Sequence, residues 1–176
     1  MVIQVSLDCT LVRGIKQQVS NTNSLSWSDV DQLCQKIVTD IESQSDKITN
    51  IIAVSRGGLI PGTILSHMLN VERVYCFGMK SYSDDSRVNS IPSIHQPLTD
   101  NVMWTLRSST GSTLIVDDIS DTGDTFSYIR DQVTSDIDNT RFVSLCLKHN
   151  CKLTPRYFGK VTKKWIVFPW ELNNDV

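Results

Sequence analysis

Residues 114–125, which read LIVDDISDTGDT, decide the fold. Three apolar residues typical of a buried strand come first, and the adjacent carboxylates of Asp117 and Asp118 follow directly. The chain then stays polar until a helix is expected near Thr125–Val133. The segment therefore predicts a strand, a polar loop and a helix in immediate succession.

Each part of this loop could bind a phosphorylated sugar. Backbone N–H groups at the start of a helix, together with the hydroxyls of Thr122 and Thr125, can cradle a phosphate. Gly123 lets the backbone approach a ligand closely. The carboxylates of Asp117 and Asp118 can accept hydrogen bonds from sugar hydroxyls or hold Mg²⁺. The alternative is an Asp-rich helix cap with a solvated loop, but the twelve residues together favour a sugar-phosphate site.

The same order of apolar run, polar loop and helix recurs on both sides of this segment. Helical spacing of apolar residues predicts a first helix from Val30 to Ile41, with Ser28 and Asp31 as its capping box. Trp165–Phe168 is either a last strand or a loop. The other predicted elements are strands at Ile51–Val54, Val74–Phe77, Leu114–Val116 and Phe142–Leu147, and a helix at Leu59–Leu69.

Continuous apolar strands that alternate with helices predict an α/β fold with a doubly wound, mainly parallel sheet. In such sheets ligands bind beyond the carboxyl ends of the strands. The polar loops that follow Val54, Val116 and Leu147 are therefore expected to share one mouth.

The chain divides into an N-terminal arm over residues 1–24, which includes a candidate edge strand, and a single domain over 25–176. Within that domain, residues 80–110 lose the apolar periodicity and contain two prolines. Long loops inside compact α/β domains are usually functional, so a flexible loop that acts as a lid is predicted here. The alternative is a plain surface insertion.

Composition narrows the class of protein. The chain has 176 residues, of which 40% are apolar, enough for one globular domain with its own core. A net charge of -2 argues against a nucleic-acid coat or a polybasic membrane binder, so neither a nucleic-acid partner nor a stable membrane association is expected. Five cysteines without a CxxC pair favour a reduced, cytoplasmic protein.

Three segments resemble motifs of one enzyme family. Residues 114–125 resemble the phosphoribosyl-diphosphate signature of the type I phosphoribosyltransferases. Residues 51–62, IIAVSRGGLIPG, resemble the diphosphate loop and following helix of the xanthine-guanine phosphoribosyltransferases, and residues 165–171, WIVFPWE, resemble their purine-binding tail. The resemblance implies the type I phosphoribosyltransferase fold with a mobile loop and a small C-terminal purine-binding hood.

The resemblance also implies an activity. Members transfer the 5-phosphoribosyl group from 5-phosphoribosyl 1-diphosphate to a 6-oxopurine, here guanine, xanthine or hypoxanthine, and release the nucleoside monophosphate and diphosphate in purine salvage. Mg²⁺ is the implied cofactor, and a homo-dimer or homo-tetramer is the implied assembly. Two alternatives stay open, namely an enzyme of this fold that uses another base, such as a pyrimidine, and a non-catalytic regulator that senses the sugar diphosphate.

Individual roles follow from the same resemblance. Asp121 would take the proton that leaves the purine ring, and Asp118 would hold the metal ion. Lys148 would donate to the 6-oxo group, Trp165 would stack on the base, and the Ile166 backbone would accept from the 2-substituent. The residues implied for phosphoribosyl diphosphate are Arg56, Gly57, Ser81, Tyr82, Arg87, Asp117, Asp118, Asp121, Thr122, Gly123, Asp124 and Thr125.

Asp124 departs from the family signature, which often has a small or neutral residue there, so its carboxylate is expected to point away from a phosphate. Trp170 is expected to pack in the core or an interface rather than on the base. Without the resemblance, Lys148 would be read equally well as a solvated lysine at a strand end, and Trp165 as a packing residue.

Overall fold

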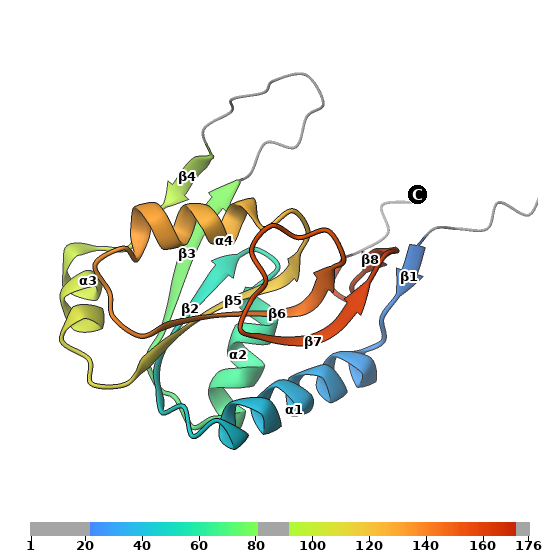
Figure 1. Cartoon of the computed structure of the whole chain (residues 1–176), viewed down its shortest axis with the longest axis horizontal. Coiled ribbons are helices and arrows are strands. Elements are labelled where there is room, and N and C mark those ends of the chain that lie inside the picture. The colour runs from blue at the N-terminus through green and yellow to red at the C-terminus, as the bar shows by residue number, and fades with distance from the viewer. Residues whose placement is uncertain (1–21, 81–91, 172–176) are drawn as a thin grey trace, which may run out of the picture.

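A six-stranded sheet forms the centre of the computed structural model, which describes residues 22–80 and 92–171 (Figure 1). The strand order is β4-β3-β2-β5-β6-β7, and every neighbouring pair is parallel except β3 with β4. The strands are β2 (Ile48–Ser55), β3 (Val74–Lys80), β4 (Ser93–Gln96), β5 (Ser112–Ser120), β6 (Thr140–Lys148) and β7 (Tyr157–Thr162). The predicted mainly parallel α/β sheet is confirmed.

Helices cover both faces of this sheet, as a doubly wound fold requires (Figure 1). Helices α1 (Trp27–Ser43) and α2 (Leu59–Met68) share one apolar core with Ile51 and Leu114. Helices α3 (Asp100–Arg107) and α4 (Asp124–Tyr128), with the π-helix η1 (Ile129–Val133) that continues α4, share a second core with Ile52 and Ile115. Adjacent strand residues thus face opposite cores, because side chains alternate along a strand.

Helix α1 begins earlier than its apolar spacing predicted. Ser26 is the N-cap, its side chain accepts from the Asp29 N–H at 3.1 Å, and the Asp29 carboxylate accepts from the Ser26 N–H at 2.8 Å. The predicted capping box at Ser28 and Asp31 is therefore wrong. Both pairs have the same spacing, but Leu25 is buried and its N–H donates to the Val167 carbonyl at 2.9 Å, which fixes where the helix starts.

Three elements, β4, α3 and β7, were missed, and the first two correct the predicted loop over 80–110. In its described part β4 pairs with β3, and α3 begins where the Thr99 hydroxyl accepts from the Val102 N–H at 3.4 Å. Strand β7, at the opposite edge of the sheet, was not predicted either. The rest of the predicted loop, residues 81–91, lies outside the described residues, so its lid function stays a prediction.

A separate two-stranded sheet joins the end of the N-terminal arm to the C-terminal segment (Figure 1). Strand β1 (Thr22–Ser24) pairs in parallel with β8 (Trp165–Val167). Behind it, the Phe168 ring stacks on Trp170 at 4.7 Å between centroids, and Trp27 lies 5.9 Å from Trp170. Trp170 thus packs among aromatic side chains, as expected. In the described ranges no helix is both long and apolar enough to span a membrane.

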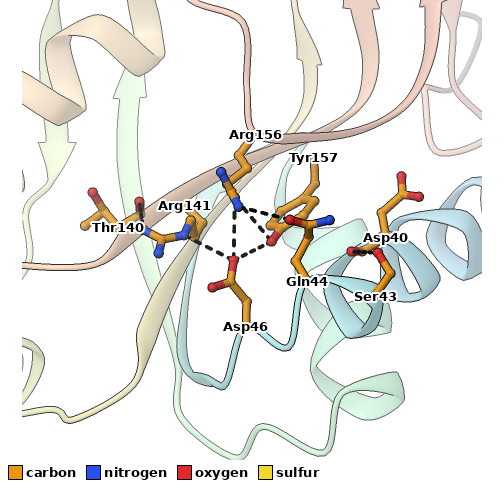
Figure 2. A network of polar contacts seen from close by, with 8 residues as sticks. All are labelled: Asp40, Ser43, Gln44, Asp46, Thr140, Arg141, Arg156 and Tyr157. Atoms are coloured by element: carbon orange, nitrogen blue, oxygen red, sulfur yellow. Dashed lines mark hydrogen bonds and ion pairs between the residues drawn. The ribbon is translucent and has the colours of Figure 1, made fainter.

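Polar contacts tie three elements together at the amino-terminal ends of β6 and β7 (Figure 2). The Asp46 carboxylate, just after α1, accepts hydrogen bonds from the Tyr157 hydroxyl and from Arg141 Nε, the latter at 3.2 Å. Arg156 lies 3.6 Å from the same carboxylate and also donates to Gln44 at 3.5 Å. This network lies at the amino-terminal ends of the strands, opposite the carboxyl ends that carry the candidate site.

The sheet changes direction between β2 and β5. From β2 the chain passes through α2 to β3 on one side, whereas β5 lies on the other side of β2. Loops that follow two such strands diverge and leave a crevice, the usual ligand site in open α/β sheets. The loop after Ser55 lies against the end of β5 at this position.

Candidate active site

The loop after β2 lies directly against the end of β5. The Ser55–Arg56 peptide bond is cis, and Arg56 is exposed. A Cβ atom added at Gly57 would overlap the Asp118 carboxylate, and one added at Gly58 would stand 2.6 Å from the Val54 carbonyl oxygen. Only residues without a side chain allow this approach, so the two signature segments of the sequence meet in space.

Asp117 and Asp118 lie within β5, not in a loop after it. The predicted strand end at Val116 is therefore wrong, because β5 continues its pairing with β6 to Ser120. The Asp118 N–H donates to Asp117 Oδ1 at 3.0 Å, and the Ile119 N–H donates to Asp118 Oδ1 at 2.7 Å. Pairing on β6 holds both carboxylates at the carboxyl end of the sheet.

The surroundings of these two carboxyls disfavour their charged forms. Burial raises the pKa of Asp117 well above its usual range, and the neighbouring charge of Asp118 adds to the effect. Burial also raises the pKa of Asp118 to about 6, with a smaller contribution from the charge of Glu171. Glu171 accepts a hydrogen bond from the Phe168 N–H at 2.8 Å, so the tail that carries β8 is held near these carboxylates. Sequence reasoning did not single out Glu171 as a site residue.

Residues 121–124 form the polar turn that starts α4. Gly123 has a φ of 85°, a left-handed conformation that favours glycine, and it is the residue before the helix. The Asp124 N–H donates to the Thr122 hydroxyl at 3.3 Å. A cavity of about 420 Å³ lies along this turn and the end of β5, lined by Asp117, Asp118, Ile119, Ser120, Asp121, Thr122, Gly123, Asp124, Thr125 and Phe126. The turn and the two half-buried carboxyl groups thus share one cavity, as a sugar-phosphate site requires.

Lys148 and Trp165 lie together on the other side of Asp121. Lys148, the last residue of β6, donates from Nζ to the Lys164 carbonyl at 2.7 Å, and its ammonium lies 5.6 Å from the centre of the Trp165 ring. Trp165 is 56% exposed, whereas Ile166 is buried in the core and presents only its backbone on β8. The structure therefore brings together the cation and the aromatic ring implied for a base.

A second cavity, of about 560 Å³, lies beside Lys148. It is lined by Asp121, Thr122, Lys148, His149, Asn150, Lys152, Thr162 and Lys163. Asp121 and Thr122 line both cavities, so the Asp121 carboxylate stands where the two meet. The loop after Leu147 was expected at this mouth, but His149, Asn150 and Lys152 were not assigned to the site. Thr162 and Lys163 were missed because they follow from β7, which was not predicted.

Three implied residues, Ser81, Tyr82 and Arg87, lie outside the described residues.

Asp124, the departure from the family signature, is exposed, and its Oδ1 accepts from Lys152 Nζ at 3.1 Å. The Lys152 ammonium, and after it the Thr122 hydroxyl, hold the pKa of Asp124 below its usual range.

The carboxylates of Asp117 and Asp118 suit Mg²⁺. Across 22–80 and 92–171, no group of three or more His, Cys, Asp or Glu side chains is placed to hold a metal ion by itself. Mg²⁺, however, commonly binds one or two carboxylates and takes its other ligands from water and substrate phosphates. Two adjacent desolvated carboxyls at the edge of a cavity fit that pattern, and the oxygens of Asp118 lie against Gly57 of the other loop.

Comparison with known proteins gives a consistent result. The phosphoribosyl transferase domain family matches residues 21–175. The xanthine-guanine phosphoribosyltransferase of Idiomarina loihiensis is 26% identical over 85% of this chain and 86% of its own length, and that of Chromohalobacter salexigens is 29% identical over 85% and 83%. A purine phosphoribosyltransferase structure from Pyrococcus horikoshii superposes with a TM-score of 0.72 at 29% identity, covering 89% of this chain and 98% of its own.

Proposed function

Because the chain belongs to the phosphoribosyl transferase domain family, it is a glycosyltransferase, and we propose that its acceptor is a 6-oxopurine. In this proposal it transfers the 5-phosphoribosyl group of 5-phosphoribosyl 1-diphosphate to guanine, xanthine or hypoxanthine, in purine salvage. The observation that carries the proposal is the place of Asp121, which lines both the cavity at the phosphate turn and the cavity beside Lys148. The named purine transferases that resemble this chain support it.

The sugar diphosphate binds along the first cavity. Its 5-phosphate lies on the backbone N–H groups and hydroxyls of residues 121–125, where Gly123 opens the turn. Asp117 and Asp118 accept hydrogen bonds from the ribose hydroxyls, and the Arg56-Gly57 loop binds the diphosphate. Ser81, Tyr82 and Arg87 complete this binding set in the proposal.

Asp118 is the residue proposed to hold Mg²⁺, which would neutralise the charge of the leaving diphosphate when bound. The protein's own part is positioning and electrostatic stabilisation. As the bond between C1 and the diphosphate oxygen breaks, positive charge builds on the ribose ring, and the carboxylates at the end of β5 lie next to it. The purine ring nitrogen then bonds to C1, and the Asp121 carboxylate accepts the proton that this nitrogen loses.

The base lies in the second cavity, beside Lys148 at the end of β6, and Trp165 lies next to Lys148. Trp165 offers an exposed ring for stacking. The Lys148 ammonium can donate but cannot accept, so it favours an oxo group over an amino group at the 6-position. A base that stacks on Trp165 would take the place of the Lys148 cation on that ring, and the cation would then meet the base edge.

The location and the assembly of the enzyme are part of the proposal. We propose a cytoplasmic homo-dimer or homo-tetramer that binds nucleotide products and acts on small-molecule substrates. Analytical ultracentrifugation of the full chain tests the assembly, and a single monomeric species at micromolar concentration would contradict it.

One assay tests the proposed reaction. Protein, Mg²⁺ and 5-phosphoribosyl 1-diphosphate are mixed with guanine, xanthine, hypoxanthine, adenine or a pyrimidine in turn, and nucleotide is measured by chromatography. Nucleotide is expected with the 6-oxopurines. Nucleotide formed only from a pyrimidine would support the first alternative, whereas binding of the sugar diphosphate without any nucleotide would support a regulator.

A further inference from the structure

Lys152 contacts the phosphate turn through both its main chain and its side chain. Its N–H donates to the Thr122 carbonyl at 2.8 Å, and its Nζ donates to Asp124 Oδ1 at 3.1 Å. It also lines the second cavity, next to Asp121. Nothing in the sequence motifs drew attention to Lys152, which lies between β6 and β7.

Close packing places Lys152 there. A Cβ atom added at Gly123 would lie 2.7 Å from the Leu153 N and 2.9 Å from Cys151 Sγ, so this segment lies directly on the turn. Cys151 Sγ is also 3.0 Å from both the Ser120 hydroxyl and the Leu153 carbonyl oxygen. Cys151 therefore contacts the end of β5, and Leu153 lies against Gly123 of the turn, so both neighbours of Lys152 are held in place.

Asp124 makes such an anchor necessary for a phosphate ligand. It is the first residue of α4 and lines the cavity of the phosphate turn. A phosphate dianion placed on this turn would meet a like charge, which lowers its affinity. The Lys152 ammonium is the cation that the structure places on that carboxylate.

We propose that Lys152 is a positioning residue that neutralises Asp124, so that the turn can accept the phosphate of a phosphorylated ribose. The inference rests on the proposed function, since it takes the sugar phosphate to bind residues 121–125. Lys152 acts through Asp124 and need not touch the ligand. The pair would explain how this chain tolerates an acidic residue where the family signature often has a neutral one.

Binding measurements on four proteins test the proposal. Calorimetry with 5-phosphoribosyl 1-diphosphate and Mg²⁺, without a base, gives the affinity of the wild type, Lys152→Ala, Asp124→Asn and the double variant. Lys152→Ala is expected to weaken binding roughly three- to tenfold, because the unpaired carboxylate repels the ligand across a solvated gap. Asp124→Asn should tighten it, and the double variant should return to within about twofold of the wild type.

Controls separate this role from a structural one. Lys152→Arg should keep wild-type affinity, and the loss in Lys152→Ala should shrink as salt is raised, because exposed charges are screened. Lys163→Ala removes another lysine from the same cavity, and Asp124→Asn should not reverse any loss that it causes.

Two further outcomes would contradict the inference about Lys152, and a third would contradict the proposed function. A double variant as weak as Lys152→Ala would mean that Lys152 binds the ligand itself, and equal affinity of Lys152→Ala and wild type would mean that the pair is irrelevant. Either result overturns only the inference about Lys152 and leaves the proposed function standing. A wild type that fails to bind the sugar diphosphate overturns the proposed function, and the inference falls with it.

Discussion

Asp121 is an exposed carboxylate whose importance comes from where it stands, at the junction of two cavities. Asp121→Asn keeps the shape and polarity of the side chain but removes the proton acceptor. We expect kcat to fall by ~10²–10⁴-fold, the usual contribution of a general base, while the affinity for 5-phosphoribosyl 1-diphosphate changes little. Steady-state kinetics combined with calorimetry checks both quantities. Unchanged kcat on a verified base would remove Asp121 from the mechanism.

Lys148 and Trp165 touch each other but should have separable effects on the base. Adenine would present an amino donor to the Lys148 ammonium, and an unsatisfied buried partner costs ~1–3 kcal/mol. Lys148→Ala should therefore lower the ratio of kcat/KM for guanine over adenine by roughly tenfold or more. Trp165→Ala should weaken every purine alike, because stacking does not distinguish them.

The measurement is that ratio in the wild type and both variants, with Lys163→Ala as the matched loss of a nearby lysine. If the wild type prefers adenine, or if Lys148→Ala leaves the ratio unchanged, the 6-oxopurine proposal is wrong even though the chain remains a phosphoribosyltransferase.

Asp46 links the end of α1 to β6 and β7 and should make their docking depend on acid (Figure 2). The Tyr157 hydroxyl, followed by Arg141, holds the pKa of Asp46 below its usual range. The folded pKa is then lower than the unfolded value of about 3.9, so this stability is complete above that pH and is lost as pH falls through the folded pKa. Asp46→Asn should cost about 1–3 kcal/mol of unfolding free energy at pH 7.

Urea unfolding of the wild type and Asp46→Asn at pH 7 and near pH 3 checks this expectation. The difference in unfolding free energy between the two proteins should be smaller near pH 3 than at pH 7. Asp40→Asn is the matched control. It breaks only the half-exposed ion pair with Lys36 and should cost less than about 1 kcal/mol at either pH. If the difference in unfolding free energy between the wild type and Asp46→Asn were larger near pH 3 than at pH 7, the predicted sign of the effect would be wrong.

Elements with a continuous apolar pattern were predictable, and those without one were not. Strands β2, β5 and β6 are buried on both faces, so their apolar runs identified them. Strand β7 was missed because Gly159 and Lys160, both disfavoured in strands, interrupt it, although Tyr157 and Gly159 do alternate as buried positions. Helix α3 was missed because it is short and follows a proline, and its Thr99 cap went unread.

The candidate site divides in the same way, into residues that belong to a sequence motif and residues that do not. The two segments with a sequence signature could be predicted, and the loop after β2 does lie against the end of β5 at the switch point of the sheet. The family assignment that those signatures suggested is confirmed by the match over residues 21–175. Sheet topology predicted the loop after Leu147 at this mouth, but Lys152 carries no motif, and the packing of residues 151–153 on Gly123 could not be predicted from the sequence.

The whole molecule gives up stability to keep two carboxyls desolvated at one end of its sheet. The pKa of Asp118 is raised by burial to about 6, above the unfolded value of about 3.9, so the folded state holds this proton to a higher pH than the unfolded chain does. The cost of burial is therefore absent below about pH 4 and complete above about pH 6.

Asp118→Asn should accordingly raise Tm at pH 7.5 and leave it almost unchanged at pH 4. The amide oxygen can still accept from the Ile119 N–H, so the local structure is preserved. The same variant should lose the rise in Tm that Mg²⁺ and 5-phosphoribosyl 1-diphosphate together give the wild type. Differential scanning calorimetry at both pH values, with and without these ligands, decides the matter, and a lower Tm at pH 7.5 would contradict the argument.

The pairing of β1 with β8 has a consequence for the order of events on the ribosome. Strand β1 is made early and has no partner until residues 165–167 emerge. By then the loops after β2 and β5 have long been synthesised. A growing chain thus completes the loops proposed to bind the sugar diphosphate first and the residues proposed to bind the base last, so in this proposal a chain arrested before β8 would carry a donor site with no acceptor site.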